Sequence, residues 1–65
     1  MNLSSREICT LLAALLYWEE EMLPHGRRII RPYFRQIGQP RAKSLNRIEL
    51  RRLRQRLRKH LDDVR

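Results

Sequence analysis

Arginine is the residue type in this chain with the most distinctive chemistry, and it is concentrated in the second half. Residues 27–65 carry fourteen basic residues, twelve of them Arg, against three acidic ones, whereas residues 1–26 carry one basic and four acidic residues. The net charges of the two parts are therefore +11 and −3. A guanidinium group is a planar fork that binds phosphate or carboxylate through paired hydrogen bonds and stacks on flat rings. A field this uneven attracts polyanions, and nucleic acid is the most common of them.

Four of the arginines are spaced so that they would form one row along a helix. Residues 47–58 cover about 16 Å at 1.5 Å per residue, which is long enough to contact several phosphates of a nucleic-acid strand. A solvated face, partly neutralised by nearby glutamates, is the alternative interpretation. The predicted contact residues are Arg47, Arg51, Arg54 and Arg58, with Arg52 on the back of the same helix.

A second basic cluster surrounds two aromatic residues in the middle of the chain. Aromatic side chains among cations can stack on exposed bases. However, Tyr33 and Phe34 share a helical spacing with Ile30 and Ile37, which favours packing of all four at one end of the core. The cations are available for phosphate contacts under either interpretation, and they are Arg27, Arg28, Arg31, Arg35, Arg41 and Lys43.

No combination of residues predicts catalysis or metal binding. The three glutamates at 19–21 invite a metal or acid–base interpretation, but successive residues of a helix point in different directions. Cys9 would need a positioned base to act as a nucleophile, and both histidines lie far from it in the sequence, so we expect Cys9 to pack in the core. The sequence has no Gly-rich phosphate loop, no Ser/His/Asp set and no zinc-type Cys/His spacing. We expect no enzyme activity, no cofactor, no bound metal and no small-molecule substrate.

Two segments carry the same signal for a helix start. In each, the side chain of the cap residue can accept from the amide three residues later, and the Glu at that position can reach back to the amide of the cap. This reciprocal pair is a capping box, and the apolar residues on either side of it can pack together as a hydrophobic staple. The two segments are Leu3-Ser4-Ser5-Arg6-Glu7-Ile8 and Leu45-Asn46-Arg47-Ile48-Glu49-Leu50.

The first segment predicts a helix over residues 5–22, and the second predicts a helix over residues 47–61. Apolar residues recur at spacings of three and four in the first helix, which Pro24 and Gly26 end. Those of the second form a narrow stripe at nearly heptad spacing, with Val64 as a candidate extension. The predicted core consists of Ile8, Leu11, Leu12, Leu15, Trp18 and Met22, widened by Ala14 and Leu16, together with Leu50, Leu53, Leu57 and Leu61.

The connector, residues 23–45, contains the signals for a short third helix over residues 32–37. Arg31 precedes a proline and therefore favours an extended conformation, whereas Pro32 suits a first helical turn and Gly38 a helix end. We predict an all-α fold, an antiparallel two-helix hairpin with a short third helix in the connector, as a single domain over residues 1–65. Antiparallel packing would bring the three glutamates at 19–21 close to Arg47 and Arg51.

The pattern Leu-Ser-x-x-Glu followed by Leu-Leu-Ala-Ala-Leu-x-Tyr-Trp, which begins at Leu3, resembles one in short uncharacterised bacterial proteins. In those proteins a second segment, Leu-(Ser/Thr)-x-x-Glu-Ile-x-x-Leu-x-x-Arg-Leu, follows a connector that contains Pro and Gly. Residues 45–57 resemble it, with Asn46 at the cap position and Leu50 in place of Ile. The two segments cover about half the chain, and the resemblance implies no activity. The density of Arg in this chain departs from the pattern.

Size and cysteine content restrict the setting in which the chain works. At this length a domain buries only about 60% of its unfolded surface, so we expect support from a partner or a larger assembly. A single cysteine, Cys9, cannot form an internal disulfide, which fits a reducing cytoplasmic compartment. The apolar run of residues 8–18 is too short to cross a bilayer, and it lacks the flanks of a signal peptide.

These observations predict a small nucleic-acid-binding or ribonucleoprotein accessory protein that contacts mainly the phosphate backbone of RNA or DNA. The alternative is a protein-interaction module, either a homodimer or a small subunit of a larger complex. It would use Leu50, Leu53, Leu57 and Val64 as a seam between helices. Binding to anionic membrane surfaces is a third interpretation, but the second helix lacks the Trp or Phe anchors that this would require, so we expect no membrane contact.

Overall fold

The computed structural model describes residues 2–64, without the side chain of Val64. The described residues are all-helical, with three α-helices and no strand, which confirms the predicted all-α class. The helices are α1 (Ser5–Tyr17), α2 (Arg27–Gln36) and α3 (Arg47–Val64). The predicted role of Val64 in the leucine stripe lies outside the described side chains.

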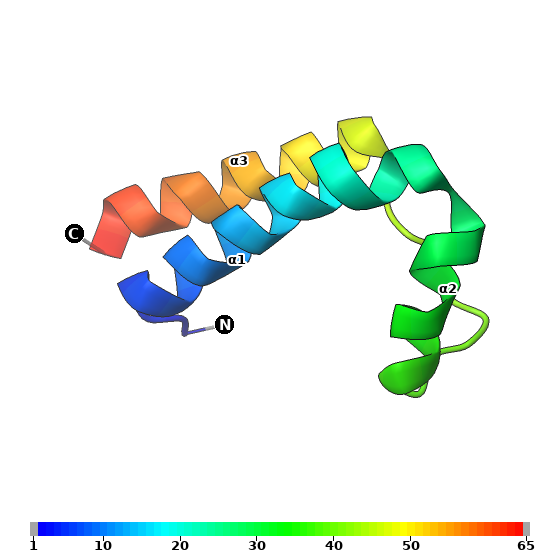
Figure 1. The fold of residues 1–65 in the computed structure, drawn as a ribbon. Coiled ribbons are helices and arrows are strands. Elements are labelled where there is room, and N and C mark those ends of the chain that lie inside the picture. Colours follow the sequence, from blue (N-terminus) through cyan, green and yellow to red (C-terminus); the bar gives the residue numbers. More distant parts are fainter. Residues whose placement is uncertain (1, 65) are drawn as a thin grey trace.

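The longest helices, α1 and α3, pack against each other and lie side by side, and the start of α1 and the end of α3 lie at the same end of this pair (Figure 1). Helix α2 turns away at the opposite end (Figure 1). The molecule is elongated as a result, with principal extents of 38 × 22 × 15 Å.

Both predicted capping boxes are confirmed. At α1 the Glu7 amide donates to Ser4 Oγ at 3.1 Å, and the Ser4 amide donates to Glu7 Oε1 at 2.8 Å. At α3 the same two bonds join Asn46 and Glu49, both at 2.9 Å. Each box satisfies amides that the first turn of a helix leaves without partners. The starts of the two long helices are therefore determined by four local residues.

The capping box of α1 predicts a specific pH dependence of stability. The pKa of Glu7 lies below its ordinary value, mainly because the Ser4 backbone N–H donates to the carboxylate and secondarily because of the Ser4 side chain. A lowered folded-state pKa means that this contribution is present above the unfolded pKa of about 4.3 and is lost as the pH falls through the lower folded value. Glu7→Gln should therefore have a lower Tm than the parent at neutral pH, and the gap should close in acid. A gap of equal size at both pH values would contradict this account.

The first helix does not continue to Met22 as predicted. Helix α1 ends at Tyr17 and is followed by a π-helical turn, Trp18–Met22, in which the Leu23 amide donates to the carbonyl of Trp18. A 3₁₀ turn, Leu23–His25, follows it. Pro24 has no N–H for the carbonyl four residues earlier and its ring crowds that carbonyl. The regular α-helical ladder therefore gives way to wider and then tighter turns before Gly26, which has a φ of 75°.

The predicted connector helix over residues 32–37 is wrong in its boundaries. Helix α2 begins at Arg27, so Arg31 is helical rather than extended and Pro32 lies inside the helix. This longer helix buries Ile30, a tertiary contact that outweighs the local preference of a residue before proline. Gly38 ends α2 as predicted, with a φ of 75°. The Gly38 amide donates to the Arg35 carbonyl at 3.1 Å and the Gln39 amide to the Phe34 carbonyl at 2.8 Å, the two bonds of a Schellman motif.

The core lies mainly between α1 and α3, and its central residues were predicted correctly. Three predicted core positions differ, because Leu11, Ala14 and Leu16 are exposed. Helix α3 also continues past Leu61, where the predicted second helix ended. The predicted packing of four connector residues at one end of the core is confirmed for only two of them. Ile30 is buried and Phe34 is half-buried, but Tyr33 is 52% exposed and Ile37 is 68% exposed. The buried apolar residues are Ile8, Met22, Ile30, Leu50 and Leu61, and the half-buried ones at predicted core positions are Leu12, Leu15, Trp18, Leu53 and Leu57.

Candidate nucleic-acid interface

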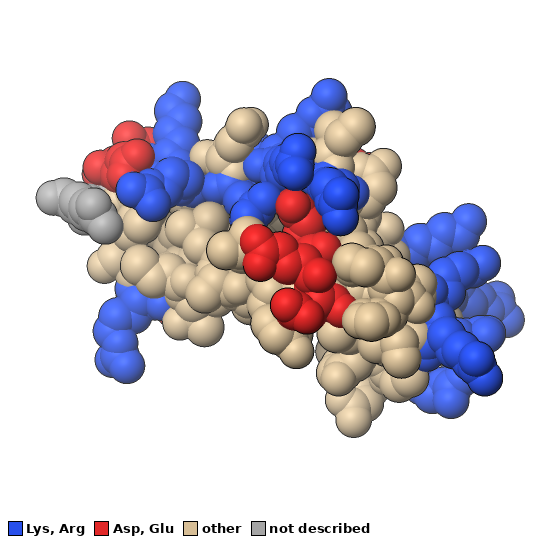
Figure 2. Space-filling view, turned by 45° about the horizontal axis from the view of Figure 1, so that its top comes forward, with Lys and Arg blue, Asp and Glu red and all other residues tan. Residues whose placement is uncertain are grey.

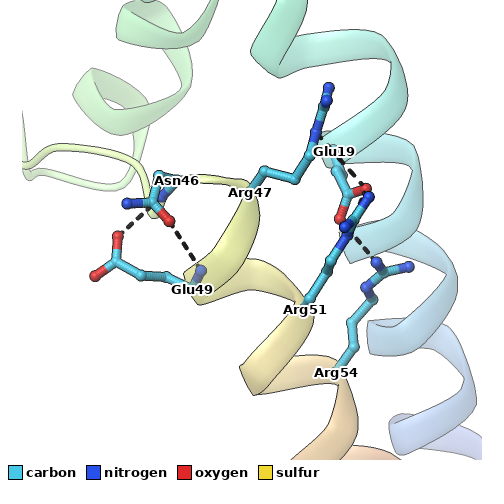
Figure 3. Close-up of polar contacts among 6 residues, drawn as sticks. All are labelled: Glu19, Asn46, Arg47, Glu49, Arg51 and Arg54. Carbon is cyan, nitrogen blue, oxygen red and sulfur yellow. Dashed lines mark hydrogen bonds and ion pairs between the residues drawn. The ribbon is translucent and has the colours of Figure 1, made fainter.

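Three of the four arginines in the predicted row converge on one buried carboxylate (Figure 3). Glu19, in the turn after α1, has a side chain only 8% exposed. Arg54 Nη2 donates to Glu19 Oε1 at 2.7 Å, and the Nε atoms of Arg51 and Arg47 lie 3.5 Å and 3.9 Å from Oε2. The predicted approach of the glutamates at 19–21 to the start of the last helix is therefore confirmed for Glu19. One carboxylate against three guanidinium groups leaves a local charge of +2.

The position of Glu19 follows from a pattern that the sequence analysis missed. Glu19 continues the series of core positions 8, 12 and 15 at alternating spacings of four and three. Arg54 likewise lies between core positions 50 and 57 with spacings of four and three. An acid and a base at core positions of two facing helices form an ion pair that specifies how the helices align. The heptad spacing of these two polar residues was the signal that would have found the pair.

The four arginines of the row differ in how much of the guanidinium group is free. The Arg54 side chain is only 22% exposed, and its buried Nε has no hydrogen-bond partner among the described residues. Arg51 is 60% exposed, and Arg47 is also exposed. Arg58 is exposed and its Nε lies 3.7 Å from Asp62 Oδ1, one helical turn later. Arg54 is therefore a structural residue, whereas the other three retain donors that face solvent.

The outer face of α3 carries further cations. Arg52, Arg56 and Lys59 lie along one side of the helix and, with Gln55 and Glu49, line a shallow depression. Glu49 is engaged in the capping box, and Arg52 is exposed as predicted. Lys and Arg side chains extend along the α3 side of the molecule in Figure 2.

The second predicted cluster surrounds α2 and the loop that follows it. Four of its six cations, Arg27, Arg31, Arg41 and Lys43, line a groove between α2 and residues 40–46. Arg28 and Arg35 are exposed on α2 outside the groove. In Figure 2 a second group of Lys and Arg side chains covers this end of the molecule, and residues without charge separate it from the cations along α3. The cations are therefore divided between two surfaces rather than gathered on one.

Trp18 joins α1, α2 and the loop at the back of this groove. Its indole Nε1 donates to Ser44 Oγ at 2.8 Å. The rings of Tyr33 and Phe34 meet the indole edge to face, with centroid distances of 6.1 Å and 6.0 Å. Trp18 is half-buried, as its predicted place in the core requires. A single side chain thus connects the end of the first helix to both walls of the groove.

Other residues with candidate chemistry are not assembled into a site. Cys9 is exposed rather than packed, because it lies on the side of α1 away from α3 that Leu16 and other exposed residues share. Within residues 2–64 no group of His, Cys, Asp and Glu side chains has an arrangement that could hold a metal ion. No helix in that part of the chain is long and apolar enough to span a membrane.

Comparison with protein-family models, with curated proteins and with solved structures gives no match. The chemistry of the chain's own residues is therefore the basis for assigning a function.

Proposed function

We propose that this chain is a small nucleic-acid-binding protein, or an accessory protein of a ribonucleoprotein, that contacts mainly the phosphate backbone. The observation that supports it most is the excess of exposed cations. Every ion pair among the described residues involves Glu19 or Asp62, and the arginines in these pairs are the four of the row on α3. The cations of residues 27–64 outside those pairs are Arg27, Arg28, Arg31, Arg35, Arg41, Lys43, Arg52, Arg56 and Lys59.

In this proposal α1 and α3 form an antiparallel hairpin that acts as a scaffold. The Glu19–Arg54 pair and the leucines of α3 hold the two helices in register, while Arg47, Arg51 and Arg58 direct their free donors outward. Such contacts position a protein along a strand or duplex but carry no sequence information of their own. The binding is accordingly expected to be tolerant of sequence.

The salt dependence of binding tests the proposal. The affinity for a fluorescent oligonucleotide, measured by anisotropy, should fall linearly with salt on logarithmic axes, with a slope of about 0.7 to 0.9 per phosphate contacted. Arg52→Gln should reduce the slope by about one such contact. Arg6→Gln removes the same charge from α1 and is the matched control, which should leave the slope unchanged. No binding at low salt, or binding independent of salt, would overturn the proposal.

The alternative, a non-enzymatic protein-interaction module, now depends on a different surface. The leucine stripe of α3 that the sequence suggested for it packs largely against α1. The observation that favours this alternative is an exposed row at spacings of four, made of Ile29 and Tyr33 on α2 and Ile37 directly after it. A concentration-dependent dimer in sedimentation experiments, indifferent to added oligonucleotide, would support it over nucleic-acid binding.

A further inference from the structure

The groove between α2 and the loop has the charge expected of a site for an anion. Four cations, Arg27, Arg31, Arg41 and Lys43, line it and none of its lining residues is acidic. Its volume is about 610 Å³, within the range of small-molecule sites. Gly26 caps the start of α2 beside it and has no side chain to accept from the first-turn amides. The occupant must therefore bring negative charge.

The floor of the same groove is apolar and includes an aromatic ring. Ile30 is buried, and Phe34 is half-buried with its ring held edge to face against Trp18. An inorganic phosphate alone would leave this floor without a partner. A ligand that combines a flat apolar ring with a phosphate matches both the floor and the rim, because every nucleobase has a face that stacks on an aromatic side chain.

We propose that this groove binds single-stranded nucleic acid, with one unpaired base against Phe34 and the flanking phosphates on Arg31, Arg41 and Lys43. Base faces are accessible in single strands, whereas in a duplex they are stacked on one another. The proposal rests on the proposed function and makes it specific: single strands are recognised at the groove, and α3 supplies backbone contacts that any nucleic acid can use.

Trp18 provides a direct readout of occupancy. It is the only tryptophan in the chain, and it contacts both Phe34 and Ser44, two residues that line the groove. A base that enters the groove changes the surroundings of this indole, whereas a strand bound only on the outer face of α3 does not. Short oligothymidylate should therefore change Trp18 fluorescence in a saturable way, at the same concentrations that raise the anisotropy of a labelled copy.

Paired variants separate the groove from the rest of the basic surface. Phe34→Leu keeps an apolar side chain but removes the aromatic face, and it should weaken oligothymidylate binding about fivefold or more, since loss of a base–aromatic stack corresponds to about 5- to 150-fold. Lys43→Gln should weaken binding and lower the salt slope by about one contact. Arg52→Gln should also lower the slope but leave the change in Trp18 fluorescence intact. Circular dichroism of each variant shows whether it is folded.

Five results would overturn the groove proposal. In the first, Phe34→Leu and Lys43→Gln bind oligothymidylate as tightly as the parent and only Arg52→Gln binds more weakly. This result would place the nucleic acid on α3 and would leave the proposed function standing. A base site would be excluded if duplex displaced oligothymidylate from the groove as well as a single strand does. It would also be excluded if inorganic polyphosphate changed Trp18 fluorescence in the same way as the oligonucleotide. Polyglutamate that gives the same fluorescence change would identify an acidic protein partner. Absence of binding to any nucleic acid would remove the proposed function as well.

Discussion

Replacing Glu19 by Ala is expected to lower the free energy of unfolding by about 3 to 5 kcal/mol. The side chain is buried, and its carboxylate faces Arg47, Arg51 and Arg54. Without it, three guanidinium groups on the same face of α3 would repel one another, and Arg54 would retain a desolvated charge with no counterion. Arg54→Ala should cost less than Glu19→Ala, because Glu19 would keep its contacts with the other two arginines.

The expected loss is large relative to the total stability of so small a protein. At about 0.05 to 0.15 kcal/mol per residue, a chain of this length has a free energy of unfolding of about 3 to 10 kcal/mol. Glu19→Ala should therefore have a much lower denaturation midpoint than the parent when unfolding is followed by circular dichroism. Glu20→Ala is the matched control, because Glu20 is adjacent and exposed, and it should change stability by no more than about 0.5 kcal/mol.

A double replacement distinguishes the loss of the charge pair from damage to the helix contact. Glu19→Leu combined with Arg54→Leu removes both buried charges and fills the space with apolar atoms, so the variant should fold and be at least as stable as the parent. Two results would show that the pair does not hold α1 and α3 together. The double variant could be less stable than Glu19→Ala, or Glu19→Ala could be as stable as Glu20→Ala.

Ile8→Ala should destabilise the protein by about 2 to 5 kcal/mol. Ile8 is the most deeply buried residue, with no exposed area, and lies in the first turns of α1 against α3. Removing its side chain loses the transfer free energy of the removed atoms and leaves a cavity that two helices cannot fully close. The measurement is again the denaturation midpoint, with an unchanged m-value as evidence that the unfolded state is the same.

Leu16→Ala is the control for this second prediction. It is the same kind of truncation in the same helix, but Leu16 is 42% exposed and lies outside the core. Its cost should be well below that of Ile8→Ala. Equal costs would mean that the packing of α1 on α3 contributes little to stability.

The Glu19 cluster also connects stability with the proposed binding. All four arginines of the row were predicted phosphate contacts, but the structure uses Arg54 to hold the helices together and engages Arg47 and Arg51 in part. Three cations for one acid is more than charge balance requires. The surplus explains how the same row can join α1 to α3 and still present donors to a polyanion.

Local signals in the sequence were sufficient to predict where the long helices begin and which residues form their contact. A capping box depends on four consecutive residues, and Ser4–Glu7 and Asn46–Glu49 both form theirs. Helical spacing likewise identified Ile8, Leu50 and Leu61, because burial of a periodic apolar face is the largest favourable term for an amphipathic helix. The end of α2 was also predicted, because a glycine at positive φ completes a Schellman motif without help from distant residues.

Predictions failed where a distant contact outweighed a local preference. Arg31 favours an extended conformation before Pro32, but burial of Ile30 keeps it helical. Ile37 has the spacing of a core residue, yet α2 turns away from α1 and α3 and leaves it exposed (Figure 1). The direction in which a helix leaves a turn cannot be derived from a few neighbouring residues.

By itself, the order of the amino acids determined the helical class, the two capped helix starts, the apolar stripes and the charge imbalance between the two parts of the chain. These properties arise from side chains within a few residues of one another. Only the tertiary structure decided which arginines remain free, because that depends on Glu19 reaching Arg54 across 35 positions of the chain. It also decided that four of the remaining cations surround Phe34 in one groove, since the loop and α2 are brought together there by Trp18 and not by sequence proximity.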